Sequence, residues 1–209
     1  MTTTIAVYAT DTMADWEYAY LTAEAARAVQ LRPDHIAVRF VGDGTESVRS
    51  LGGMTVEPSL DLAELTALPE LAALVIPGGD TYFTGHERLL ATVSALLERD
   101  IPVAAICGAT FLLARGGHLD ERAHTSNAPE FLAYSGYGGG EHYVAAPVVT
   151  DRGVTTATGL RPVEFTAEVM RLTDLYPKDL ADTWERLNHT ADPADYQALM
   201  EATDAFAQS

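Results

Sequence analysis

The sequence is poor in cysteine and in basic charge, and both shortages restrict what the protein can bind. It contains one cysteine, Cys107, which excludes a disulfide within the chain and a zinc site built from several cysteines. The 13 Lys and Arg residues stand against 30 Asp and Glu residues, for a formal net charge of −17. Nucleic acids and anionic membranes are bound through clusters of basic residues, so we expect neither as a partner.

Long apolar runs are also missing. The longest mainly apolar stretch, 101–114, is too short to span a bilayer and is interrupted by glycine. The first ten residues have neither the basic start nor the apolar segment of a secretory signal. No group of His, Asp and Glu residues has the spacing of metal ligands, so we expect no metal and no cofactor. The sequence therefore predicts a cytoplasmic protein whose partner is a small molecule.

Short apolar runs alternate with helical stretches along most of the chain, which is typical of a mostly parallel sheet covered by helices on both faces. The predicted strands are 4–9, 35–42 and 101–106, with a strand running into a glycine turn over 71–80 and hairpins over 48–58 and 146–159. The predicted helices are 15–30, 61–67, 86–99, 109–115 and 163–172, with Asp15 and Asp61 as N-caps of the first two.

The end of the chain differs from the rest in being polar and acidic. Two helical patches, 178–188 and 194–206, carry apolar residues at helical spacing, so we expect them to pack against the main body. We therefore divide the chain into a domain over 1–175 and a C-terminal helical extension of that domain over 176–209.

The single cysteine lies where a predicted strand turns into a helix, in "VAAICGATFLLARGG". Gly108 and Ala109 follow it and are small enough for the sharp turn of a nucleophile elbow. A thiol at the start of a helix feels the positive end of the helix dipole, which favours the thiolate. The free N–H groups there can also stabilise an oxyanion. This pattern predicts a reactive cysteine rather than an inert core residue.

Two further stretches carry residues suited to the same chemistry. "VIPGGD", 75–80, ends a buried strand in two glycines, whose backbone N–H groups can approach a substrate oxygen closely. "DWE", 15–17, places Glu17 in the first turn of the first helix. A carboxyl group buried there against the thiol would have a raised pKa and could donate or accept a proton.

Taken together, Glu17, "IPGGD" (76–80), "AICGAT" (105–110) and "GVTTATGLRPVEF" (153–165) resemble the ThiJ/PfpI family, the group of the Parkinson-associated deglycase within the class I glutamine amidotransferase-like superfamily. The resemblance covers about 5–173. It implies a flavodoxin-like three-layer α/β sandwich and a homodimer. It also implies that Cys107 is the nucleophile, that Glu17 hydrogen-bonds its sulfur, and that Gly79 and Gly108 supply oxyanion-binding N–H groups.

The chain departs from the family pattern at the residues that would serve as a base. Gly108 follows Cys107 where other branches have a histidine, and the late His-x-Glu of glutamine amidotransferases is absent. We therefore expect neither a PfpI-type peptidase nor a true glutamine amidotransferase. Asn127 occupies the place of a histidine near the thiol in other members, and His124 is the alternative third residue of the site.

Three functions remain open at this point. The first is a hydrolase or lyase in which a Cys107 thiolate, paired with Glu17, attacks a small electrophilic carbonyl-type carbon. The second is a redox or stress-response protein that works through oxidation of Cys107. The third is a non-catalytic family member that binds a ligand in the same pocket.

Overall fold

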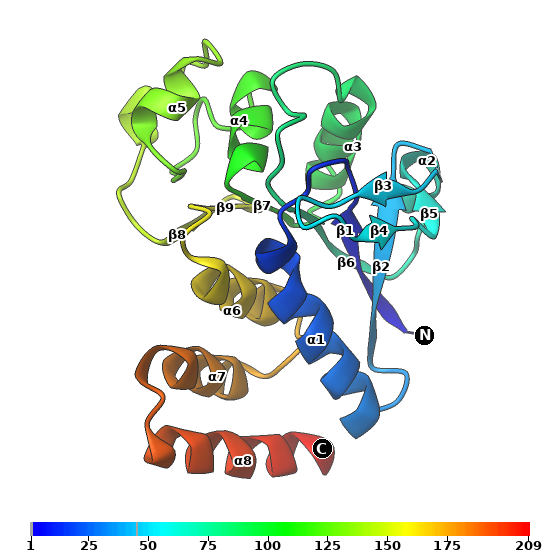
Figure 1. The fold of residues 1–209 in the computed structure, drawn as a ribbon, viewed down its shortest axis with the longest axis vertical. Helices are drawn as coiled ribbons and strands as arrows, with labels where there is room; N and C mark the ends of the chain where they lie inside the picture. Colours follow the sequence, from blue (N-terminus) through cyan, green and yellow to red (C-terminus); the bar gives the residue numbers. More distant parts are fainter. Residues whose placement is uncertain (1, 45) are drawn as a thin grey trace.

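The computed structural model describes residues 2–44 and 46–209 and shows a twisted sheet between two layers of helices (Figure 1). The sheet has the strand order β5-β2-β1-β6-β7-β9-β8, parallel throughout except for β8, which runs antiparallel to β9. The flavodoxin-like sandwich predicted from the sequence is confirmed. The strands are β1 (Thr3–Tyr8), β2 (Ile36–Gly42), β5 (Leu60–Asp61), β6 (Leu71–Ile76), β7 (Val103–Ile106), β8 (Val148–Asp151) and β9 (Val154–Ala157), and a separate hairpin joins β3 (Val48–Arg49) to β4 (Thr55–Val56).

Helices cover both faces of the sheet. They are α1 (Asp15–Leu31), α2 (Leu62–Leu65), α3 (Glu87–Leu97), α4 (Gly108–Arg115), α5 (Pro129–Ala133), α6 (Pro162–Leu172), α7 (Lys178–Thr190) and α8 (Pro193–Ala207), with a short 3-10 turn at Gly140–His142. In Figure 1, α1 and α6 lie on one face, and α3 and α4 lie on the other. None of the helices within the described ranges is long and apolar enough to cross a lipid bilayer.

The central strand β1 shows why the sheet is buried on both faces. Successive side chains of a strand point to opposite faces, and here both sets are apolar. Ile5 and Val7 pack into the core under α1 and α6, whereas Ala6 and Tyr8 pack into the second core under α3 and α4. A continuous apolar run in the sequence is therefore the expected signature of this strand.

The ends of the first two predicted helices illustrate what the sequence shows and what it does not. Asp61 caps α2 as predicted, and it forms a reciprocal capping box with Glu64. The prediction for Asp15 is wrong, because Ala14 is the N-cap of α1 and Asp15 is already helical. Its carboxylate instead accepts a hydrogen bond of 2.6 Å from the N–H of Gly52 and so ties α1 to the β3–β4 hairpin.

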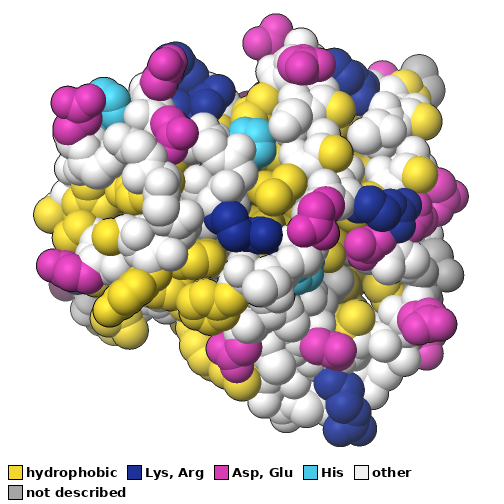
Figure 2. Space-filling view, turned by 90° about the horizontal axis from the view of Figure 1, so that it is seen from above, with side chains coloured by type: hydrophobic (Ala, Val, Ile, Leu, Met, Phe, Trp, Pro, Cys, Tyr) yellow, Lys and Arg dark blue, Asp and Glu magenta, His cyan; other side chains and the backbone are white. Residues whose placement is uncertain are grey.

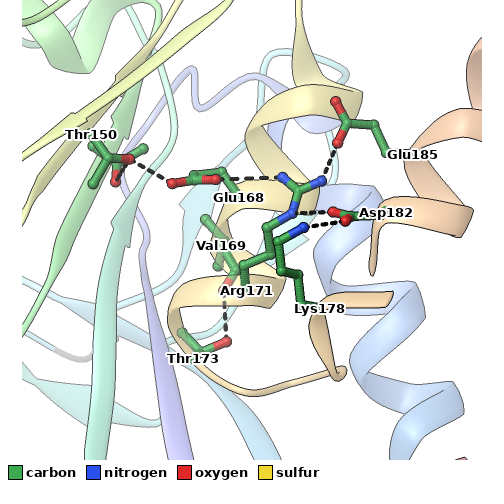
Figure 3. Close-up of polar contacts among 9 residues, drawn as sticks. Thr150, Glu168, Val169, Arg171, Thr173, Lys178, Asp182 and Glu185 are labelled. Carbon is green, nitrogen blue, oxygen red and sulfur yellow. Dashed lines mark hydrogen bonds and ion pairs between the residues drawn. The ribbon is translucent and has the colours of Figure 1, made fainter. Parts of the chain in front are cut away.

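The C-terminal extension forms two helices, and a polar cluster around Arg171 of α6 anchors the first of them (Figure 3). The Nε of Arg171 donates to Asp182 of α7 over 2.7 Å, and its other nitrogens pair with Glu185 and Glu168. Thr150 of β8 donates to Glu168 over 2.8 Å. The cluster therefore links the edge strand, α6 and α7. On α8 the fully buried side chain is Phe206, which packs edge-to-face on Tyr176.

The strand order of the sheet indicates the edge at which a ligand site is expected. The chain runs outward from β1 to β2 on one side and then crosses to β6 on the other, so the order reverses between β1 and β6. Open α/β sheets bind ligands at the carboxyl ends of their strands beside such a reversal. The segments after β1, β6 and β7 meet there and include Glu17, Gly78 and Cys107.

Candidate active site

Cys107 lies at a sharp bend between β7 and α4. Its φ of 59° and ψ of −124° are unfavourable for a residue with a side chain. The bend is held by hydrogen bonds from the Cys107 N–H to the carbonyl of Ala157 and from the Thr110 N–H to the Cys107 carbonyl. The bend gives the strained turn geometry of a nucleophile elbow, as the sequence predicts.

The residue after the cysteine is glycine for a steric reason. A Cβ at Gly108 would lie 2.5 Å from the carbonyl oxygen of Gly79, closer than atoms can approach. The ends of β6 and β7 therefore pack backbone to backbone at this point. In this chain, the histidine that follows the cysteine in other branches has no room.

Glu17 lies beside the sulfur and is almost completely buried, with 1% of its surface exposed. Its Oε2 accepts a hydrogen bond of 2.6 Å from the N–H of Gly78. Its Oε1 has no nitrogen or oxygen partner among the residues that the structure describes, and Cys107 is the hydrogen-bonding side chain beside it. A Cβ at Gly159 would lie 2.8 Å from the sulfur and 2.9 Å from Oε1, so this glycine leaves room for the pair.

Burial controls the titration of this pair. It raises the pKa of Glu17 from 4.5 to about 7, although the hydrogen bonds from Gly78 and Cys107 act in the opposite direction. While Glu17 is ionised, burial and the negative charge of Glu17 raise the pKa of the Cys107 thiol to about 11, against the hydrogen bonds from Asn127 and the Gly108 N–H. The helix dipole considered from the sequence is thus opposed by two effects that only the fold shows. Glu17 and Cys107 therefore titrate as a pair, which loses its first proton near pH 7 and its second near pH 11.

Asn127, and not His124, is placed against the sulfur. The Nδ2 of Asn127 donates to the Cys107 Sγ over 3.2 Å. His124 is fully buried elsewhere, with Nδ1 2.7 Å from the carbonyl of Arg122 and Nε2 3.0 Å from the Tyr137 hydroxyl. Burial lowers the pKa of His124 and so favours its neutral form. The structure therefore brings Cys107, Glu17 and Asn127 together and leaves His124 out.

A cavity of about 180 Å³ opens onto the sulfur. Gly79 and Gly108 line it, and within the described residues their N–H groups have no oxygen or nitrogen acceptor. Apolar side chains form much of the wall, namely Trp16, Leu51, Phe83 and Phe131. A larger groove of about 780 Å³ between α1, α7 and α8 is lined by no cysteine, serine or histidine, whereas Cys107 lines the smaller cavity.

Sequence reasoning missed several residues of this site. Gly159, which flanks Cys107 and Glu17, was recognisable only as a glycine after the end of β9. The sequence predicted that the N–H of Gly78 would approach a substrate oxygen, and this is wrong, because that N–H donates to Glu17. Trp16 sits between the two acidic residues of "DWE", and its Nε1 donates to the carbonyl of Gly159 over 3.3 Å. In the described part of the chain, no three His, Cys, Asp or Glu side chains are placed to hold a metal ion.

Comparison with known proteins places the chain in a family. The sequence model of the DJ-1/PfpI family matches residues 3–172. The chain belongs to the DJ-1/PfpI family. It is 35% identical over 199 residues to the "uncharacterized protease YoaZ" of Bacillus subtilis, covering 93% of this chain and 94% of that protein. The part of the chain that the family model matches ends before α7 begins at Lys178.

Solved structures of family members superpose on nearly the whole chain. A thiJ/pfpI family protein from Bacillus anthracis matches with a TM-score of 0.87 and 34% identity, covering 97% of both chains. A DJ-1 superfamily protein from Agrobacterium tumefaciens matches with a TM-score of 0.77 and 33% identity, covering 91% of this chain and all of the other. The ThiJ/PfpI resemblance drawn from the sequence motifs is confirmed.

Proposed function

We propose that this protein is a cysteine-dependent hydrolase or lyase that acts on a small electrophilic carbonyl-type substrate, with the Cys107 sulfur as nucleophile and Glu17 as its proton acceptor. The observation that carries the proposal is the environment of Glu17. Its Oε1 has Cys107 beside it, and its pKa of about 7 allows it to hold or release a proton near neutral pH.

The singly ionised pair carries one proton, and the surroundings favour placing it on the carboxyl group. The sulfur is half-buried and receives N–H groups from Asn127 and Gly108, while Glu17 is the more deeply buried of the two. Negative charge is more stable where there are more donors and more solvent. Protonation of Glu17 also removes the charge that raises the pKa of the thiol. The reactive form is therefore a thiolate beside a neutral carboxyl group.

The reaction follows from the positions of these groups. The thiolate attacks the electrophilic carbon, a carbon–sulfur bond forms, and the π electrons of the substrate C=O move to its oxygen. The N–H groups of Gly79 and Gly108 bind that oxyanion. Glu17 then gives its proton to the leaving group as the carbonyl re-forms and the bond to that group breaks, which leaves a thioester on Cys107. Ionised Glu17 next takes a proton from a water molecule, whose oxygen attacks the thioester carbon, and the carbon–sulfur bond breaks to release the product and restore the thiolate.

Peptide hydrolysis is the less favoured reaction for this site, even though the relative YoaZ is named a protease. Cleaving an amide requires an acid placed at the leaving nitrogen, and the histidine that would serve is absent from the cavity lining. Aldehydes, thioesters and isocyanides are already electrophilic and do not share that requirement.

A turnover panel tests the proposal. Wild-type protein is assayed with aldehydes, thioesters, isocyanides and short peptides, beside Cys107→Ser, Glu17→Gln and, as a control, Asp204→Asn on the exposed face of α8. We expect turnover of at least one small electrophile, lost in the first two variants and kept in the control. Turnover that is the same in all four proteins contradicts the proposal.

A second candidate function is a response to oxidants, and the half-buried single thiol with N–H groups around it favours that candidate. Two equivalents of peroxide would convert the thiolate to a sulfinate with release of two waters. Mass spectrometry after mild peroxide treatment distinguishes the two. Absence of added oxygen on Cys107 eliminates the redox function, and rapid addition without turnover of any substrate favours it over the enzyme.

A further inference from the structure

We propose that Asp80 determines substrate charge at this site, so that the cavity admits uncharged or cationic electrophiles and disfavours anionic ones. The inference rests on the proposed function, because it concerns what reaches the Cys107 thiolate. It goes further in assigning a role to a residue outside the Cys107–Glu17–Asn127 group.

The backbone holds Asp80 at the mouth of the cavity. Asp80 follows Gly79 at the end of β6, and its N–H donates to the Thr12 hydroxyl over 2.8 Å. Asp80 lines the same cavity as the sulfur of Cys107. Among the described residues, its carboxylate has no hydrogen bond and no ion pair, so its charge is not neutralised by a neighbour.

The residues that line the cavity supply no positive charge to offset that of Asp80. The residues lining the cavity include no Lys, Arg or His. Two further carboxylates, Asp11 and Asp15, are engaged nearby with the backbone N–H groups of Arg49 and Gly52. Arg161, which follows the Gly159 loop, pairs with Glu164 over 3.1 Å. Figure 2 shows acidic side chains spread over the face seen from above, together with several basic side chains.

The apolar walls make this charge more effective. Trp16, Phe83 and Phe131 line the cavity and displace part of its water, although Trp16 and Phe83 are themselves half-exposed, so the charge of Asp80 is screened less inside the cavity than in bulk solution. An incoming carboxylate or phosphate would meet the negative charge of Asp80 within the cavity lining. Negative charge is accommodated only where it develops, at the N–H groups of Gly79 and Gly108.

Methanethiosulfonate reagents of different charge test the inference without needing the substrate. Each transfers its thioalkyl group to the Cys107 thiolate, forming a disulfide and releasing methanesulfinate. The trimethylammonium-ethyl, methyl and sulfonato-ethyl reagents are compared in low salt, each rate being divided by the rate with N-acetylcysteine amide. The wild type is expected to favour the cationic reagent over the anionic one by at least about tenfold, because Asp80 attracts the one and repels the other beside the sulfur.

Two variants separate a local effect from the field of the whole chain. Asp80→Asn and Asp204→Asn change the net charge equally, but Asp204 lies on the exposed face of α8, far from the cavity. We expect Asp80→Asn to reduce the cation-to-anion ratio by about threefold or more and Asp204→Asn to leave it unchanged. Added salt should reduce the wild-type ratio as well.

The other possible results contradict the charge selectivity, the role of Asp80 or the proposed function itself. Equal normalised rates for the three reagents overturn the charge selectivity but leave the thiolate and the proposed function intact. Equal reductions by the two variants overturn the role of Asp80. If no reagent modifies Cys107 at neutral pH, the proposed function is itself refuted and the role of Asp80 falls with it.

Discussion

The amide of Asn127 donates from Nδ2 to the sulfur of Cys107 over 3.2 Å, and its orientation is fixed from the opposite side. The N–H of Gly159 donates to the Oδ1 of Asn127 over 2.9 Å. A backbone N–H can only donate, so the amide oxygen must face Gly159 and the nitrogen must face the sulfur. Asn127 cannot replace a catalytic histidine as a base, but it is a fixed hydrogen-bond donor to the sulfur of Cys107.

Replacing Asn127 should therefore make the thiol less acidic. A hydrogen bond to a charged group contributes about 1.5–3 kcal/mol, so Asn127→Ala should slow iodoacetamide alkylation of Cys107 at neutral pH by about tenfold or more. Asn127→Asp should slow it further, because a second carboxylate repels the thiolate. Alkylation as fast as wild type in both variants would show that the amide does not stabilise the sulfur charge.

Glu17 should make the protein less stable as the pH rises. Its pKa is about 7 in the folded protein, against an ordinary value of 4.5. A raised carboxyl pKa means that the folded state binds the proton more tightly, so this stabilisation is complete below the ordinary value and is lost as the pH rises through the folded one. The loss amounts to about 3 kcal/mol between about pH 4 and pH 8.

Urea unfolding of wild type and Glu17→Gln across this range measures the effect. The free energy of unfolding of the variant, minus that of wild type, should increase with pH, since glutamine does not ionise. Taking the difference cancels the carboxylates whose pKa is lowered by ion pairs, such as Asp182 beside Lys178. A difference independent of pH would contradict the raised pKa of Glu17.

The strained backbone of Cys107 predicts an unusual order of stability. At an ordinary position alanine is more stable than glycine by about 0.4–1 kcal/mol. At a φ of 59° and ψ of −124° a side chain costs about 1–3 kcal/mol, which glycine avoids. Cys107→Gly should therefore unfold at higher urea than Cys107→Ala, with both inactive. The ordinary order, alanine above glycine, would show that the bend is not strained.

The Arg171 cluster predicts where the C-terminal extension is attached. Arg171→Met keeps the apolar stem but leaves the carboxylates of Glu168, Asp182 and Glu185 facing one another, so the free energy of unfolding should fall by about 1–3 kcal/mol. Arg186→Met is the matched control, because Arg186 is half-exposed and pairs with Asp195 alone. Equal stability of the two variants would mean that the cluster does not hold α7 in place.

The sequence predicted the layers well because the apolar pattern of each strand reports burial directly. β1 is apolar on both faces, and the glycine–glycine and Asp-Arg-Gly turns mark the two hairpins. Cys107 and Glu17 were found because a strand-to-helix turn and a helix start are local features. The features that the sequence did not predict depend on contacts between residues that are far apart in the chain. The raised pKa values of Glu17 and Cys107 depend on packing. Asp15 accepts a hydrogen bond from the N–H of Gly52, 37 residues away, and does not cap the helix.

Asn127 and His124 show the same limit within the site. Both lie in one loop, three residues apart, and spacing alone did not decide which of them faces the sulfur. The choice depends on distant partners, namely Gly159 for Asn127 and Tyr137 for His124. Side-chain direction in an irregular segment is decided by tertiary contacts, for which no sequence period exists.

The ultraviolet absorbance of the thiolate, followed against pH in wild type, Glu17→Gln and Cys107→Ser, tests most directly whether sulfur gives its proton to Glu17. We expect a wild-type signal that is absent in Cys107→Ser and rises with a midpoint near about 7, where the pair loses its first proton; the second proton, lost near about 11, leaves the carboxyl group and adds little thiolate signal. Glu17→Gln should show a single rise between these values. A wild-type signal that appears only near about 11 would place the proton on sulfur at neutral pH and contradict the proposed nucleophile.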